Sequence, residues 1–375
     1  MTETALVPSS VADMPSSWLV RCVGTVFFDV VFSDLDGEPR LGKEVYATNL
    51  GLSPGGIANV AVALARLGLR VELESDFSQD AFGEYLWSVL SDEGIDLSRS
   101  RRLGGWSTPI TVSLAYRHER SLVTNLVPPP PRMASGQEGS RRPDALIASL
   151  GETDGQLLTR LRGETRLLVA DAGSEIAKLN RRKLHQRLAN VDVFLPNSRE
   201  ALLCSHRHDL IEAARAIGQH VPLVVIKNGA KGSLAFDSRS NTLYQEDAVI
   251  IEEHDTTGAG DVFNAAFVYA TLAEWELPHR LRFANLCAAT SIRFAGGALS
   301  APCWNDIEAW WRAQEDPGVR RRFAFLASAL ARPRPTRTCR RSCASLSAWT
   351  IPNGNTPSAA TVYDVHGTRH EEGGS

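Results

Sequence analysis

Short apolar runs alternate with helical patterns along this chain from residue 18 to about 315. Four of the runs are typical of buried strands, and helical patterns separate them; they are residues 145–149, 167–170, 191–195 and 223–227. Strands that alternate with helices form parallel sheets that are covered on both faces. The sequence therefore predicts an α/β fold with a mostly parallel central sheet.

Two segments do not fit such a sheet. Thr108 to Tyr116 and Ser121 to Val127 alternate polar and apolar residues across a polar tip, which is the pattern of a β-hairpin. Phe32 to Thr48 adds further strand-like material earlier in the chain. We expect parts of 28–50 and 104–127 to form a small β-sheet that acts as a lid.

Both ends of the chain differ in composition from its middle. Residues 1–17 are rich in Ser, Thr and Pro, and we expect them to be disordered. Residues 316–375 are rich in Arg and contain no acidic residue between Asp316 and Asp364. Residues 320–330 could extend a helix, but the rest has no core-forming pattern. The predicted organisation is therefore a domain at 18–315 followed by a largely disordered tail.

Charge and cysteine content indicate a cytoplasmic protein. The formal net charge is -3 and the pI is about 6.3, so no overall basic field attracts nucleic acid or an anionic membrane. No apolar run approaches the ~20 residues that span a bilayer, and residues 1–17 do not resemble a signal peptide. The six cysteines lack paired metal-binding spacing, and we expect them to be reduced thiols.

The segment Asp255-Thr-Thr-Gly-Ala-Gly-Asp261 carries the strongest chemical signal. It follows an apolar run at 248–251, expected to be a strand, and precedes a helical run at 262–272. Backbone amides at a helix start lack intrahelical partners, and glycines let an anion approach them closely. A carboxylate there would repel an anion, so its presence is unexpected unless it takes part in the chemistry. Asp261 is therefore a candidate general base beside a transferred phosphoryl group.

Two earlier motifs are candidates for binding a hydroxyl compound. Asp29 lies at the end of an apolar run, where burial of a lone charge is costly, so it is either a turn residue or a ligand for hydroxyl groups. Gly55 and Gly56 enter an Ala/Val-rich helix in which Asn59 is the polar residue of the first turn. Asn59 is either a helix cap or a hydrogen-bonding partner of the substrate.

These motifs resemble those of the ribokinase-like (PfkB) carbohydrate kinases, over about residues 18 to 312. The resemblance implies a three-layer α/β sandwich with a β lid, Asp261 as catalytic base, and an anion hole formed by the amides of Gly258, Ala259 and Gly260. It also implies that Asp29, Gly55, Gly56 and Asn59 contact the sugar. The departures from the family pattern include Pro54, where a first glycine is usual, Ala266 in place of a glycine, and Phe27, where ribokinases often have a polar residue.

The remaining candidate residues concern the nucleotide and cations. Asn197 and Glu200 match either a helix capping box or the family's Asn-x-x-Glu motif, which is implicated in holding Mg²⁺ through water. The turn after the 223–227 strand is either a plain hairpin turn or a nucleotide loop. The resemblance assigns ATP to this turn and to a later helix and loop, and a monovalent cation such as K⁺ to the loop of Asp255. The nucleotide candidates are Lys227, Gly229, Gly232, Asn285 and Gly297.

The sequence thus predicts an ATP- and Mg²⁺-dependent kinase for a sugar or sugar-like alcohol, with a homodimer through the lid as the expected assembly. A nucleoside kinase on the same scaffold is one alternative, and a non-catalytic sugar- or nucleotide-binding relative is another. A dinucleotide oxidoreductase is disfavoured because no Gly-x-Gly-x-x-Gly motif follows the first strand. Neither a membrane nor nucleic acid is expected as a partner.

Overall fold

The computed structural model describes residues 18–331 except 117–118, 133–140, 252–254 and 295. Its main sheet has eight strands in the order β14-β13-β12-β11-β10-β9-β1-β4. Neighbouring strands are parallel from β4 to β12, and β13 and β14 extend the sheet in antiparallel fashion. The strands are β1 (Leu19–Val23), β4 (Arg70–Glu74), β9 (Ala145–Ser149), β10 (Leu167–Asp171), β11 (Val193–Leu195), β12 (Leu223–Lys227), β13 (Ser233–Asp237) and β14 (Thr242–Glu246).

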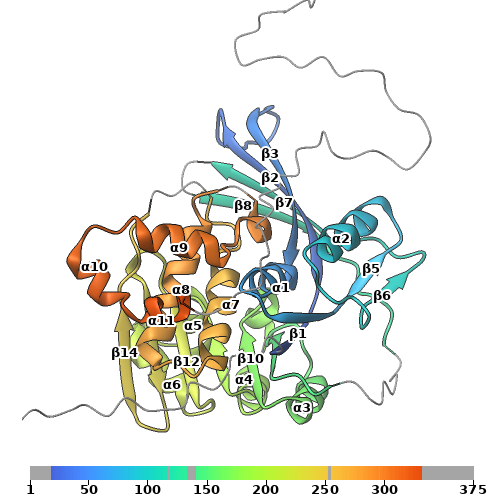
Figure 1. Ribbon diagram of the computed structural model, residues 1–375. Coiled ribbons are helices and arrows are strands. Elements are labelled where there is room, and N and C mark those ends of the chain that lie inside the picture. Colours follow the sequence, from blue (N-terminus) through green and yellow to red (C-terminus); the bar gives the residue numbers. More distant parts are fainter. Residues whose placement is uncertain (1–17, 117–118, 133–140, 252–254, 295, 332–375) are drawn as a thin grey trace, which may run out of the picture.

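Helices cover both faces of this sheet, so the predicted three-layer architecture is confirmed (Figure 1). Successive strand residues point to opposite faces. On β9, Ala145 and Ile147 join one buried apolar cluster, while Leu146 and Ala148 join another. The first cluster includes α1 (Ile57–Arg66), α2 (Ala81–Asp92), α7 (Ala259–Leu272), α8 (Leu277–Ser291) and α9 (Trp304–Arg312), and the second includes α3 (Gly155–Glu164), α4 (Arg181–Leu188), α5 (Ser198–Ser205) and α6 (Leu210–Gly218).

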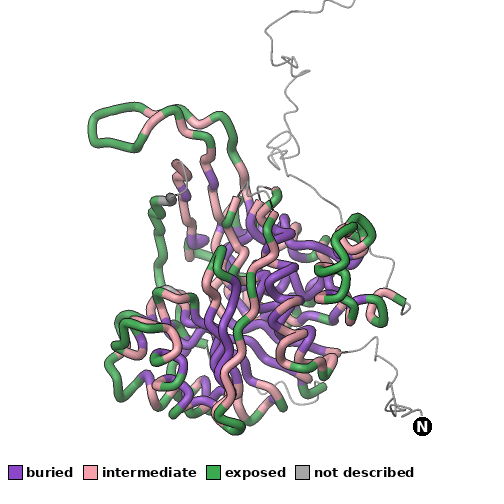
Figure 2. The backbone as a smooth tube through the Cα atoms, turned by 90° about the vertical axis from the view of Figure 1, so that its left-hand side faces the viewer, coloured by how far each residue is buried: buried purple, intermediate pink, exposed green. Residues whose placement is uncertain are grey.

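A second sheet projects from the main body as the predicted lid (Figures 1 and 2). Its strands run in the order β3-β2-β7-β8, with β2 antiparallel to β3 and parallel to β7. They are β2 (Val26–Leu35), β3 (Ala47–Gly56), β7 (Ile110–Tyr116) and β8 (Glu119–Asn125), and the short β5 (Asp76–Ser78) and β6 (Arg101–Leu103) pair beside α2. Leu122 and Val123 of the edge strand β8 are 61% and 64% exposed.

One predicted strand is wrong. Residues 248–251 form no strand, because β14 already ends at Glu246 and no further strand pairs with these residues in the described part of the chain. Ile250 is 98% exposed, so the apolar run that suggested a strand is not a core element here. The described residues between β14 and α7, 247–251 and 255–258, form neither a helix nor a strand.

The folded part of the chain also extends beyond residue 315. Two short helices, α10 (Pro317–Arg322) and α11 (Phe325–Leu330), lie within the segment predicted to be a largely disordered tail. Phe323 and Leu326 are fully buried in the first apolar cluster, which gives these helices a packing surface that the Arg-rich composition concealed. The predictions for residues 1–17, for 332–375 and for the hairpin tip at 117–118 lie outside the described residues.

The cysteines only partly follow the expectation of reduced thiols. Cys22, Cys204 and Cys287 are buried and free, and burial raises the thiol pKa of each of them. Cys303 is disulfide-bonded. Among the described residues, none of the helices has the length and apolarity that crossing a bilayer requires.

Candidate active site

The start of α7 lies in a crowded, glycine-dependent turn. Gly258, the residue before the helix, has φ +76°, and a Cβ placed on it would lie 3.3 Å from the carbonyl carbon of Gly297. No side chain from the described part of the chain caps this helix, so its first turn has no protein acceptor of the usual kind. Asp261 is the acidic residue of that first turn. The Ala259 amide donates to the Thr256 carbonyl at 3.3 Å, so the helix start combines an uncapped first turn with the Asp261 carboxylate.

The Asp261 carboxylate is held in place by Asn59. The side-chain amide of Asn59, in the first turn of α1, donates a hydrogen bond of 2.9 Å to Asp261 Oδ2. Burial raises the pKa of Asp261 to about 6, while the nearby Lys227 charge and the Asn59 hydrogen bond lower it and the Glu200 charge raises it. A carboxylate with a pKa near neutrality is ionised at physiological pH and still accepts a proton from a hydroxyl group.

Asn59 differs from its predicted role in one respect. The resemblance assigned it to the acceptor, whereas in the structure its amide nitrogen donates to the Asp261 carboxylate. Its carbonyl Oδ1 is buried and has no hydrogen-bond partner among the described residues. This oxygen lies about where Gly258 and Gly297 come together, 3.4 and 3.6 Å from the Cβ positions of the two glycines. Asn59 can therefore hold Asp261 with one atom and accept a ligand hydrogen bond with the other.

The other acceptor candidates meet at the base of the lid. Asp29 on β2 pairs in register with Ser53 on β3, and its carboxylate lies against Gly55. A Cβ on Gly55 would fall 2.1 Å from Asp29 Oδ2, so only glycine allows this approach. Gly56 has φ +61° and directly precedes α1, which carries Asn59. The lid base thus brings the Asp29 carboxylate and the start of α1 together.

Asn197 and Glu200 form a closed capping box at the start of α5. Asn197 Oδ1 accepts from the backbone amide of Glu200 at 2.9 Å, and Glu200 Oε2 accepts from the backbone amide of Asn197 at 2.8 Å. The structural alternative for this motif is therefore realised. The negative charge of Glu200 still raises the pKa of Asp261, so the two carboxylates are near enough to interact. Among the described residues no three His, Cys, Asp or Glu side chains form a metal-binding group.

Asp171, at the end of β10, is a site residue that the sequence analysis missed. Its Oδ1 is buried without a hydrogen-bond partner among the described residues. Burial raises its pKa to about 7; the Lys227 charge opposes this rise, and the charges of Asp261, Glu152 and Glu200 add to it. A carboxylate that ends a parallel strand lies at the edge where ligands bind in open α/β sheets. That position was the signal that could have identified it.

Lys227 turns toward the catalytic helix rather than outward. Its Nζ donates a hydrogen bond of 3.0 Å to Asn264 Oδ1 and lies 3.7 Å from the Cβ position of Gly260. Gly229 and Gly232 form the turn between the antiparallel strands β12 and β13, with φ values of +55° and +83°. The predicted nucleotide turn is therefore also a hairpin turn, and the Lys227 side chain that precedes it reaches the first turn of α7.

The remaining candidates hold the surrounding loops in place. Asn285 on α8 donates its side-chain amide to the carbonyl oxygens of Glu246 and Asp247. Asp255 Oδ1 accepts from the amide and the hydroxyl of Thr257, at 2.9 and 2.6 Å. Gly297 has φ +52°, and a Cβ on it would lie 3.2 Å from Ser53 Oγ, which links this loop to the lid. Gly297 thus lies beside the lid base and Asn59, whereas Asn285 and Asp255 use side-chain polar atoms in hydrogen bonds within the protein.

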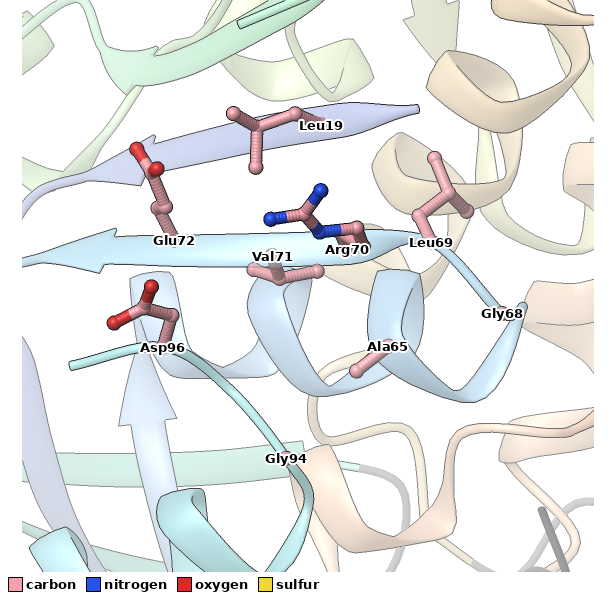
Figure 3. Close-up of a pocket in the computed structure, with 9 residues that line it drawn as sticks. All are labelled: Leu19, Ala65, Gly68, Leu69, Arg70, Val71, Glu72, Gly94 and Asp96. Atoms are coloured by element: carbon pink, nitrogen blue, oxygen red, sulfur yellow. The ribbon is translucent and has the colours of Figure 1, made fainter. Parts of the chain in front are cut away.

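A separate hollow of about 300 Å³ lies away from these residues (Figure 3). It lies at the starts of β1 and β4, where Leu19 pairs with Arg70, whereas the candidate site is at the ends of the parallel strands. Its carboxylate Glu72 already pairs with Arg21 and Arg99. None of the predicted site residues lines this hollow, and we do not regard it as the active site.

Comparison with known proteins identifies the family to which this geometry belongs. The model of the pfkB family of carbohydrate kinases matches residues 19–128 and 156–303. The chain belongs to this family. Both matched segments of this pfkB kinase contain predicted site residues: Asp29 and Asn59 lie in the first segment and Asp261 in the second.

Relatives of this pfkB kinase include both sugar and nucleoside kinases. The chain is 29% identical over 286 residues to a ribokinase from Haemophilus influenzae, covering 70% of this chain and 88% of that one. It is 27% identical over 289 residues to a nucleoside kinase from Methanothermobacter thermautotrophicus, covering 75% and 91%. The crystal structure of a putative ribokinase from Agrobacterium tumefaciens has the same fold, with a TM-score of 0.68, 19% identity and coverage of 80% and 100%. The protein is therefore a kinase of the ribokinase family.

Proposed function

We propose that this kinase transfers the γ-phosphoryl group of ATP to a hydroxyl of a sugar or sugar-like alcohol. The observation that carries the proposal is the Asp261 carboxylate, with a pKa of about 6, beside the uncapped first turn of α7. Asp261 accepts the proton of the attacking hydroxyl, and the amides of Gly258, Ala259 and Gly260 receive the negative charge of the transferred group. Lys227, next to Gly260, adds a positive charge at the same place.

The acceptor would lie between the lid base and α7. Asp29 accepts hydrogen bonds from two hydroxyl groups, with Gly55 and Gly56 providing the close backbone approach. Asn59 orients Asp261 toward the reacting hydroxyl through its 2.9 Å hydrogen bond. Because β2 and β3 of the lid carry Asp29, Gly55 and Gly56, closure of the lid would also exclude water from the site.

The Asp171 carboxylate at the end of β10, together with Asn197 and Glu200 at the start of α5, suits a magnesium ion that is held mainly by phosphates and water. Mg²⁺ neutralises charge on the transferred phosphates when it is bound. Asn197, Glu200 and the partnerless Oδ1 of Asp171 are the oxygen donors that would hold its water shell. A putative ribokinase from E. coli, 19% identical with a TM-score of 0.64, was crystallised with ATP and Mg²⁺. Lys227, Gly229, Gly232, Asn285 and Gly297 remain our proposed nucleotide contacts, and Asp255 a proposed monovalent-cation residue.

A nucleoside is the second candidate acceptor. The nucleoside kinase relative supports it, and so does Phe27, which shares a face of β2 with Asp29. The Phe27 ring lies 2.7 Å from the Cβ position of Gly56, so an apolar surface adjoins the acceptor site. A base or a deoxygenated carbon would tolerate that surface better than a fully hydroxylated sugar does.

A substrate panel with coupled detection of ADP tests the proposal. Ribose, fructose, 2-keto-3-deoxygluconate, inosine and adenosine are each offered with ATP and Mg²⁺, with and without K⁺. We expect one class to give ADP and a phosphorylated product at a rate well above the hydrolysis seen without acceptor. Binding of an acceptor with no ADP release would contradict the proposal. The proposed homodimer through the lid is checked separately by light scattering of the wild type and of Leu122→Glu.

A further inference from the structure

The segment after β14 joins the sheet to the catalytic loop and touches two proposed nucleotide residues. A Cβ on Gly232 would lie 2.0 Å from the Glu246 carbonyl oxygen and 2.6 Å from the Ala248 nitrogen, so the hairpin turn rests directly on this backbone. Asn285 donates to the carbonyls of Glu246 and Asp247, at 3.3 and 3.2 Å. Movement of residues 246–248 would therefore shift the turn and the Asn285 amide together.

A residue beyond the family match fastens this same segment. Arg322, at the end of α10, donates from Nη2 to the Asp247 carbonyl at 2.5 Å and lies 3.4 Å from Glu246 Oε2. Arg282 of α8 holds the other oxygen of Glu246 at 2.8 Å and donates to the Arg322 carbonyl. Residues after 303 lie outside the match to the family model. Of the two arginines that form this clamp on residues 246 and 247, Arg322 comes from the extension after residue 303, and Arg282 belongs to the matched domain.

The extension, which contains α10 and α11, packs against the rest of the domain, and this packing holds Arg322 in a fixed position. Phe323, next to Arg322, is fully buried and packs edge-on against Trp310, with ring centroids 5.0 Å apart. Phe325 packs against Trp275 at 5.2 Å and stacks on His279 of α8 at 4.5 Å. Figure 1 shows α10 and α11 beside the α8 and β14 side of the molecule. An arginine on such a rigid support loses little entropy when it binds the segment.

We propose that Arg322 is a positioning residue for the nucleotide, because it fixes residues 246–248 against α8 and thereby sets the shape of the Lys227–Gly232 turn. The inference rests on the proposed use of ATP. Arg322 does not touch the reacting atoms. Its effect therefore falls on nucleotide affinity.

Calorimetric binding of the non-hydrolysable ATP analogue AMP-PNP with Mg²⁺ to the full chain tests this inference. We expect Arg322→Ala to weaken AMP-PNP binding roughly three- to tenfold, and Arg322→Lys to restore part of the loss. Arg320→Ala is the matched control, since Arg320 donates to the Gln314 carbonyl, lies over Trp311 and has no recorded contact with 246–248 among the described residues. Glu246→Gln, which weakens both ion pairs without removing a buried apolar group, should weaken binding in the same direction.

The outcomes separate this inference from the proposed function. Equal AMP-PNP affinity in the wild type, Arg322→Ala and Glu246→Gln would overturn the role of Arg322 and leave the kinase proposal intact. Equal losses in Arg322→Ala and Arg320→Ala would also overturn it, because a general effect of the extension would then explain both. Absence of AMP-PNP binding to the wild type would overturn the ATP proposal and this inference with it.

Discussion

Helices α5 and α7 begin at the same edge of the main sheet but treat their first turns in opposite ways. At α5, Asn197 and Glu200 satisfy each other's backbone amides in a closed capping box. At α7, Gly258 supplies no side chain, and the acidic residue of the first turn points to Asn59 instead. A capped start stabilises its helix, whereas an uncapped start leaves amides that a ligand can use. The comparison favours α7 as the place of the proposed chemistry and a supporting role for α5.

The largest effect is expected from Asp261→Asn, which removes the base from the uncapped helix start. General bases contribute about 10²–10⁴-fold to turnover, so we expect kcat to fall by that factor while AMP-PNP still binds. Steady-state kinetics and calorimetry on the same preparation measure the two quantities. Asp209→Asn, at the cap of α6, is the control that should keep its activity. Near-normal turnover of Asp261→Asn would contradict the role of Asp261 as the base, and the start of α7 would then have no special role.

Asn59→Ala should have the next largest effect. A hydrogen bond to a charged group contributes about 1.5–3 kcal/mol, so kcat/KM should fall by ~10- to 100-fold. The Asn59 hydrogen bond lowers the pKa of Asp261, so its loss should raise that pKa above about 6. The pH dependence of kcat/KM should then shift to higher pH. An unshifted profile would mean that Asn59 does not act through Asp261.

Asp171→Asn should change stability in a pH-dependent manner. The pKa of Asp171 is raised to about 7 in the folded state. Its protonated form therefore contributes to the free energy of unfolding below its ordinary pKa, and this contribution is lost as the pH rises toward 7. The variant should therefore be more stable than the wild type at pH 8, by ~1–2 kcal/mol, and similar at pH 4. Urea unfolding at the two pH values measures the difference. A variant that is less stable at pH 8 would show that the Lys227 charge outweighs burial.

The smallest effect is expected at the capped helix. Asn197→Ala should cost ~1 kcal/mol of stability through loss of the cap, and Asp209→Ala at α6 should cost about the same. If only Asn197→Ala loses activity or requires more Mg²⁺, the effect would come from weaker binding of Mg²⁺ and not from loss of the cap. If the two variants behave alike in both assays, the Asn197–Glu200 pair is a cap and nothing more.

Much of the fold could be predicted because alternation of strands and helices is a local property. The strand at 248–251 was wrong, since apolar residues predict burial but not the partner strand that would pair with them. Helices α10 and α11 lie where a largely disordered tail was predicted, because the arginines at 320–322 obscured the packing role of the aromatic residues Phe323 and Phe325.

The site was predictable where a motif is contiguous and less so where residues meet through the fold. Asp261 and its glycines are adjacent in sequence, and the structure keeps them together. The Asn59–Asp261 bond joins residues 202 positions apart, and no local pattern reveals such a contact. Asp171 lacks any motif, so only its place at the end of a parallel strand marks it. Glu200 illustrates the reverse case, in which one local pattern fits both a cap and a metal site.

The pH profile of kcat/KM for the wild type and Asp261→Asn tests the central claim most directly. We predict that the wild-type rate rises about tenfold per pH unit up to a pKa near 6 and then levels off. The residual rate of Asp261→Asn should lack this limb, and since both enzymes use the same nucleotide, protonation of ATP is controlled. A wild-type profile that is flat through pH 6, or the same limb in Asp261→Asn, would contradict Asp261 as the base.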